Sequence, residues 1–279
     1  MSDKETYPEA ILNETLDKIS NHIKQDIDIY LIGGGAMIYY GRKAATKDID
    51  IVFTDPISLE YFIDAATKAG LYQVTPTLNE YKNLGTWVIL RAASGIQLDL
   101  FNKKVCNALT VQESVTQRAV HHKDINRLHI YLMSPEDIVL FKGITERESD
   151  LEDIRILAES SIDWNIVEEE CLTQENSETW ANLLLSKLVT LKARYGINPP
   201  LRKLRAHADA YVLIKSFELF LGDKELTFNQ LKEIVKEKTN YSPTWTRNKL
   251  KELEKIGLII SRKEGRNKKY KINKGFKPH

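Results

Sequence analysis

Two aspartates separated by a single residue stand in a β-branched stretch of the chain, Asp48-Ile49-Asp50-Ile51-Val52. The alternation of polar and β-branched residues predicts a β-strand. Because side chains at i and i+2 of a strand share a face, both carboxylates would point the same way. Close carboxylates repel unless a proton or a cation neutralises them, and Mg²⁺ is the usual cation for such oxygen ligands. A solvated strand face explains this pair alone equally well.

A third aspartate, Asp99, lies between Leu98 and Leu100 in another predicted strand, residues 96–101. Its carboxylate would face away from the side that the leucines occupy. If the two strands pair, three carboxylates would hold two metal ions that clamp an attacking and a leaving oxygen. Taken alone, Asp99 is better explained as a residue on a solvated strand face.

Three glycines, Gly33-Gly34-Gly35, follow a predicted strand at residues 27–32 and open a predicted helix that ends near Gly41. Backbone N–H groups at such a helix start are free to bind phosphate, and the missing side chains permit a close approach. The alternative is a plain tight turn. The segment is not a Walker motif, because no Lys-Ser or Lys-Thr follows it.

Together these motifs resemble the DNA polymerase beta-like nucleotidyltransferase superfamily over residues 25–160. That family combines a strand, Gly-Gly, a helix, an Asp-x-Asp strand and a third Asp on a neighbouring strand. Residues 144–154 are similar to the Arg-x-Lys-Asp-x-x-Asp-Ile segment of its minimal, stand-alone branch, which includes toxin-type enzymes of abortive-infection and toxin–antitoxin systems. Ser149 stands where lysine is common, so Lys142, about two turns earlier, is the better triphosphate contact.

The resemblance implies an enzyme that moves a nucleoside monophosphate from a nucleoside triphosphate, such as ATP, to an acceptor hydroxyl with the help of two Mg²⁺ ions. Asp48, Asp50 and Asp99 would hold the metals and carry the catalysis, and Gly33 and Gly34 would cradle phosphates. Lys142 would neutralise the leaving pyrophosphate. Asp150 and Asp153 are further nucleotide-binding candidates, because they share one face of a predicted helix. A role as surface or capping residues explains them equally well.

The C-terminal segment is strongly basic: residues 224–279 hold 16 Lys or Arg and 6 Asp or Glu, which leaves about −9 for the remainder. Predicted helices at 226–235 and 242–257 and strands at 258–262 and 269–272 resemble a winged helix-turn-helix. Such a unit binds nucleic acid, RNA or DNA, or serves as a protein–protein or dimer module. The predicted nucleic-acid contacts are Thr244, Thr246, Arg247 and Lys251 on the second helix and Arg262, Lys263, Arg266, Lys268 and Lys269 in the wing.

The predicted fold class is α+β, with a small mixed sheet and helices. We expect a nucleotidyltransferase domain at 1–160, a helical segment at 161–222 and a winged helix-turn-helix domain at 223–279. Ser134-Pro135 predicts a helix start in the first of these. His121 and His122 lack a third ligand at suitable spacing, so we predict loop residues instead of a metal site.

Composition sets the class of protein: 42% of the 279 residues are hydrophobic and 28% are charged, as in soluble globular chains. No apolar run predicts a membrane span, and the two cysteines have no CxxC spacing, so we expect a cytoplasmic protein. The acceptor stays open between tRNA or another RNA, a protein and a small molecule, as do an antitoxin partner and a homodimer. The alternative function is a DNA-binding regulator whose nucleotidyltransferase-like body senses nucleotide or is inactive.

Overall fold

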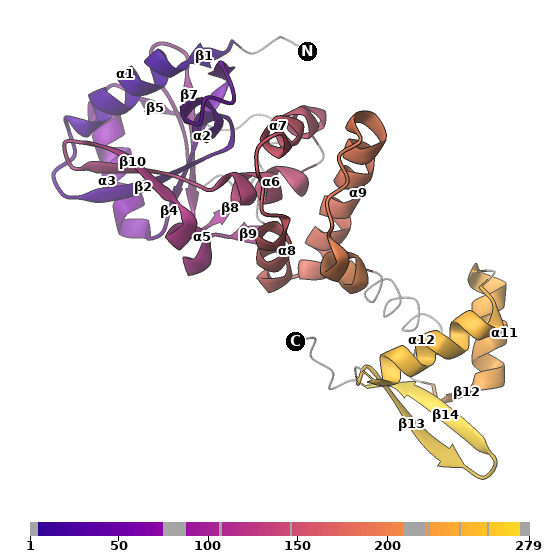
Figure 1. Cartoon of the computed structure of the whole chain (residues 1–279). Coiled ribbons are helices and arrows are strands. Elements are labelled where there is room, and N and C mark those ends of the chain that lie inside the picture. The colour runs from indigo at the N-terminus through magenta and orange to yellow at the C-terminus, as the bar shows by residue number, and fades with distance from the viewer. Residues whose placement is uncertain are drawn as a thin grey trace. The chain divides into compact units, whose positions relative to one another are not determined.

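The chain divides into two compact units, residues 1–204 and 205–279. The computed structural model describes residues 5–74, 88–105, 108–145, 147–208, 221–222, 224–239, 241–255 and 257–273. The first unit holds a sheet with helices beside it, and the described part of the second holds helices and a small sheet (Figure 1). The predicted α+β class is therefore confirmed.

A seven-stranded mixed sheet forms the centre of the first unit. Its strands, in spatial order, are β10 (Val120–Ile125), β11 (Leu128–Leu132), β2 (Ile27–Ile32), β4 (Asp48–Phe53), β7 (Gln97–Asn102), β6 (Val88–Arg91) and β5 (Tyr72–Gln73). Pairing is parallel between β11 and β2 and between β4 and β7, and antiparallel elsewhere. Two short pairs lie outside this sheet: β1 (Tyr7–Pro8) with β3 (Ala45–Thr46), and β8 (Lys104–Val105) with β9 (Leu109–Thr110).

The strands β4 and β7 separate an apolar face from a polar one. Ile49 lies opposite Leu98 and Ile51 lies opposite Leu100, and all four side chains are fully buried. The intervening positions, which hold Asp50 and Asp99, must therefore project from the other face of the sheet. The sequence also predicts that residues 87–91 form a hairpin with the strand at 96–101 through a turn at residues 93–95. The antiparallel pairing of β6 with β7 confirms this hairpin, and Trp87 lies outside the described residues.

Helices pack in two groups in this unit. Those near the start of the chain are α1 (Glu9–Ser20), α2 (Gly33–Tyr39) and α3 (Pro56–Lys68), with α1 against α3 and α3 against the central strands. The later helices are α5 (Glu113–Arg118), α6 (Pro135–Gly143), α7 (Glu148–Ala158), α8 (Trp164–Thr173) and α9 (Ser177–Tyr195), of which α7, α8 and α9 all contact α6. The predicted helical segment thus begins inside a group that packs as part of the first unit.

Polar caps start two of these helices as their sequences indicate. The Ser134 hydroxyl accepts a hydrogen bond of 3.2 Å from the Asp137 N–H, and Pro135 occupies the first turn of α6. The Asp55 carboxylate accepts one of 2.8 Å from the Ser58 N–H at the start of α3. The helix predicted to start at Ser134 is therefore confirmed.

The prediction that His121 and His122 are loop residues is wrong. His121 and His122 lie in strand β10 and not in a loop. This strand pairs on one side only and is mostly exposed, so it carries no alternating apolar pattern for the sequence to reveal. Asp124 binds both His121 Nε2, at 2.7 Å, and His129 Nδ1, at 2.8 Å.

The second unit has the two helices and the hairpin that its sequence predicts, but residues 226–227, predicted to begin the first helix, form the short strand β12. It contains β12 (Leu226–Thr227), α11 (Phe228–Thr239), α12 (Pro243–Lys255), β13 (Ile259–Glu264) and β14 (Asn267–Ile272), with sheet order β12-β14-β13. Its own buried core includes Leu231, Val235, Leu250 and Leu253. The predicted two helices and hairpin are present, and the name winged helix-turn-helix stays an interpretation of them.

Among the described residues, no helix is both long and apolar enough to cross a membrane.

Asp55→Ala should lower the free energy of unfolding by about 1 kcal/mol at neutral pH, because the first turn of α3 loses its cap. Bonds from the Ser58 and Ile57 N–H groups outweigh the opposing effect of burial, so the pKa of Asp55 is lowered in the folded state. The difference from wild type should therefore persist above about pH 4 and shrink as pH falls through that lowered pKa. Urea denaturation followed by circular dichroism measures it. Asp64→Ala, on the exposed face of α3, is the matched control, and an equal loss there would contradict the capping role.

Candidate active site

Two of the predicted carboxylates are direct neighbours across a pair of strands. Asp50 lies opposite Asp99 in the parallel pairing of β4 with β7, and Asp48 lies two positions earlier on the same face as Asp50. Asp99 is 2% exposed, and the Gln97 amide donates a hydrogen bond of 2.7 Å to its Oδ1. The structure thus brings the three aspartates together on one face, and Asp99 is not on a solvated strand face.

The glycine turn, which follows the neighbouring strand β2, lies beside the same aspartates. Ile32, the last residue of β2, pairs with Asp50, so Gly33 follows directly beside the carboxylate. Gly33 has a φ of +59°, and a Cβ there would lie 2.2 Å from Asp50 Oδ2. At Gly34 a Cβ would lie 2.2 Å from Thr46 Oγ1. The two predicted phosphate-binding glycines are therefore required by close approach and, at Gly33, by backbone conformation as well.

Mutual repulsion shapes the ionisation of the site. Burial is the largest cause of a pKa of Asp50 well above its usual range, and the charges of Asp48 and Asp99 raise it further. The positive charges of Arg147 and Lys142 act in the opposite direction. A cation bound beside Asp50 would remove the repulsion, so the electrostatics of this face favour cation binding.

Lys142 lies in a buried ion-pair cluster with two further predicted residues. Its ammonium is 2.9 Å from Asp150 Oδ1 and 2.7 Å from Asp153 Oδ2, and its side chain is 11% exposed. Burial alone would lower the pKa of Lys142, but the two carboxylates outweigh it and raise that pKa. The contacts of Asp150 and Asp153 are therefore not those of surface or capping residues. These two carboxylates keep the Lys142 side chain in its charged form.

Two lysines from elements distant in the sequence extend this cluster. Lys43, which follows α2, binds both oxygens of Asp153 at 2.9 and 3.0 Å. Lys187 of α9 donates to the Thr145 hydroxyl at 3.1 Å and to the Arg147 carbonyl at 2.9 Å. No local motif marks these residues, because their partners lie 40 or more positions away in the chain.

The carboxylates do not form a preassembled metal cage. Among the described residues, no group of three His, Cys, Asp or Glu side chains is positioned to hold a metal ion by itself. Mg²⁺ commonly takes one or two carboxylates and fills its octahedron with water and substrate phosphates. The hard oxygen donors of Asp50 and Asp99, which repel each other when both are charged, fit such an open site.

Residues 10–195 match a family model described as nucleotidyltransferase of unknown function (DUF6036). The chain belongs to this family. The match includes the glycine turn, all three aspartates and the cluster around Lys142. A search of curated proteins found no match to the chain. Membership thus supports a nucleotidyltransferase body and leaves the second unit outside the matched region.

The predicted nucleic-acid residues of the second unit divide by their contacts. Thr246 does not fit the prediction, because its side chain is fully buried and its hydroxyl donates to the Ser242 carbonyl at 3.3 Å. Three of the basic residues are paired with carboxylates of the same unit: Arg262 with Glu225, Lys268 with Glu254, and Lys269 with Glu264. The remaining predicted residues are exposed: Thr244, Arg247, Lys251, Lys263 and Arg266.

Asp50→Asn should stabilise the protein at neutral pH, because the amide removes a charge that burial and two neighbouring carboxylates oppose. The folded-state pKa of Asp50 is raised, so its contribution to stability is full below the unfolded pKa, about 3.9, and is lost as pH rises through the folded pKa. The gain over wild type should therefore appear at neutral pH and vanish in acid. Denaturant titrations without divalent cations at both pH values measure it. A variant that is no more stable than wild type at neutral pH would contradict the repulsion.

Proposed function

We propose that the chain is a Mg²⁺-dependent nucleotidyltransferase that moves a nucleoside monophosphate from a nucleoside triphosphate, such as ATP, to an acceptor hydroxyl. One observation carries the proposal: Asp50 and Asp99 are neighbours across β4 and β7, and the backbone of Gly33 lies against the Asp50 carboxylate. Membership of a family described as nucleotidyltransferases supports the same reaction class.

The metal would be held by Asp50 and Asp99 with Asp48 beside them. Two Mg²⁺ ions bound there would supply positive charge against the phosphates and the attacking oxygen. In the proposed transfer a bond forms between that oxygen and the α-phosphorus while the bond to pyrophosphate breaks. Asp99, buried and oriented by Gln97, would help to activate the acceptor hydroxyl.

The protein would position the triphosphate through backbone and fixed charge. Gly33 and Gly34, whose backbone lies against the side chains of Asp50 and Thr46, would cradle phosphates with their N–H groups. Lys142 would oppose the charge that develops on pyrophosphate, and its two carboxylate partners hold it ionised in one place. Preorganised charge of this kind stabilises a transition state without reorganisation at the moment of reaction.

The basic C-terminal segment makes RNA, and tRNA first, the favoured acceptor. A protein or a small molecule is the alternative. By analogy with the branch that the sequence resembles, a toxin-like role with an antitoxin partner in the cytoplasm follows.

A second function is favoured by the two-helix and hairpin unit: duplex DNA binding by a regulator with an inactive, nucleotide-sensing body. An electrophoretic shift confined to one operator and insensitive to Asp48→Asn and Asp50→Asn, with no transfer activity, would support it over the enzyme.

Asp48→Asn, Asp50→Asn and Asp99→Asn should each reduce transfer by at least about 100-fold, because each removes negative charge that binds the metal. Purified protein with Mg²⁺, labelled nucleoside triphosphates and tRNA, other RNA, protein or small-molecule acceptors measures this. Asp64→Asn, on the exposed face of α3, should retain full activity.

A second readout is independent of the acceptor. Mg²⁺ should raise the unfolding midpoint of wild type and leave that of Asp50→Asn unchanged. Equal shifts in both proteins, or transfer that survives the loss of Asp50, would overturn the proposal.

A further inference from the structure

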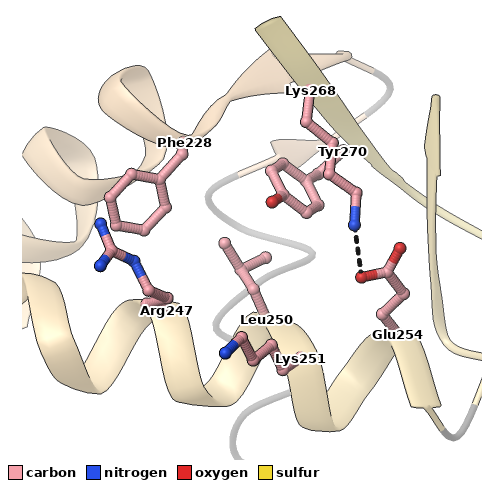
Figure 2. A pocket seen from close by; sticks show the side chains of 7 residues that line it. All are labelled: Phe228, Arg247, Leu250, Lys251, Glu254, Lys268 and Tyr270. Atoms are coloured by element: carbon pink, nitrogen blue, oxygen red, sulfur yellow. Dashed lines mark hydrogen bonds and ion pairs between the residues drawn. The ribbon is translucent and has the colours of Figure 1, made fainter. Parts of the chain in front are cut away.

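A pocket of about 320 Å³ lies in the second unit, outside the residues matched by the family model. One wall is a single face of α12, where Arg247, Leu250, Lys251 and Glu254 recur at helical spacing. Phe228, at the start of α11, and the strand β14 complete the wall (Figure 2). The volume lies at the lower end of small-ligand pockets, so it suits one compact group.

The pocket is aromatic at its sides and aliphatic between them. Figure 2 shows the rings of Phe228 and Tyr270 on the two sides of Leu250. Both rings are only partly buried and pack on the core of the unit, which fixes them in place. Aromatic side chains held in this way provide stacking surfaces for a planar ligand.

Its charge is positive. The Lys268 ammonium is 2.8 Å from a Glu254 oxygen, so these two groups largely neutralise each other. Arg247 lies over the Phe228 ring, 4.9 Å from the centroid. Within the part of the chain that the structure describes, neither Arg247 nor Lys251 is paired with a carboxylate. Two exposed cations therefore remain beside an aromatic pocket, which favours an anion attached to a flat apolar group.

A nucleotide combines an anionic phosphate with a flat base, as this pocket requires. The pocket also determines whether that base can be paired in a duplex. A base within a duplex is stacked on both faces and cannot enter a pocket between two side chains. An unstacked base of a single strand can do so while its phosphate meets Arg247 and Lys251. An acidic peptide would satisfy the charges but would bring no planar group to stack between the two rings.

We propose that this pocket receives one unstacked nucleotide of a single-stranded nucleic acid, with the base between Phe228 and Tyr270 and the phosphate at Arg247 and Lys251. The inference rests on the proposed binding of nucleic acid by the C-terminal unit and adds the form of nucleic acid that it takes. It does not depend on nucleotidyl transfer.

The test uses the full chain without nucleoside triphosphate. Short single-stranded oligonucleotides that carry 2-aminopurine, the matching duplex, free AMP and a polyglutamate peptide are titrated, and affinity and fluorescence are recorded. We expect the single strand to bind more tightly than the other three and its fluorescence to be quenched by stacking.

Two variants address the two halves of the pocket. Tyr270→Leu should weaken single-strand binding roughly 5-fold or more and reduce the quenching, because one stacking surface is lost. Lys251→Gln, a surface change that leaves the core intact, should reduce the slope of log affinity against log salt by about 0.7, as expected for one lost phosphate contact on a single strand. Lys236→Gln, an exposed lysine of α11 outside the pocket, should change neither quantity.

The outcomes separate the two proposals. Equal salt slopes for Lys251→Gln and Lys236→Gln, unchanged quenching in Tyr270→Leu, or equal or tighter binding of duplex, AMP or peptide would overturn the pocket while nucleic-acid binding stands. A wild-type chain that binds no nucleic acid at any salt concentration would overturn both.

Discussion

Repulsion between carboxylates on two paired strands is the constraint around which the first unit is organised. The parallel pairing of β4 with β7 puts Asp50 beside Asp99, and burial together with those neighbours raises the pKa of Asp50. A chain that keeps such a cluster loses folding stability unless a cation is supplied. Gly33 passes the Asp50 carboxylate at a distance that excludes even a Cβ, so its backbone lies directly against that charge. The fold is therefore destabilised at the aspartates, where the proposed chemistry requires negative charge.

The helices of the first unit carry fixed positive charges that oppose this negative charge. Lys142 of α6 is held by Asp150 and Asp153 of α7, and Lys187 of α9 bonds to the connection between those helices. Because each lysine already has its hydrogen-bond partners, its position does not depend on a bound nucleotide. The cluster is buried, so its field is weakly screened, and its effect on Asp50 shows that it reaches the carboxylates. The helices after the sheet are therefore part of the site's electrostatics.

Local patterns predicted the parts of this site better than their assembly. Alternation in residues 48–53 placed both aspartates on one face, and the glycines marked the turn. No local pattern determines the register of β4 against β7, because their parallel pairing joins residues about fifty positions apart. The ion pair of Lys43 with Asp153 likewise joins distant parts of the chain. The exposed edge strand β10 has no apolar alternation, so its sequence is typical of a loop. Thr246 has the sequence character of an exposed polar residue, but it is buried against its own helix. Long-range pairing and tertiary burial, which no window of sequence contains, account for these differences.

The two parts of the chain carry opposite net charges and would therefore interact differently with a polyanion. Residues 1–223 carry about −9 and residues 224–279 about +10. A nucleic acid is therefore repelled by the body that holds the aspartates and attracted by the C-terminal segment, and ionic screening over about 8 Å keeps both effects local. Under the proposed function, phosphate would approach the aspartates with a divalent cation or at the fixed lysines, whereas the exposed Arg247 and Lys251 would require neither. Such a division would let the C-terminal unit retain a strand by charge and stacking, while a divalent cation and the fixed lysines would admit phosphate to the carboxylates.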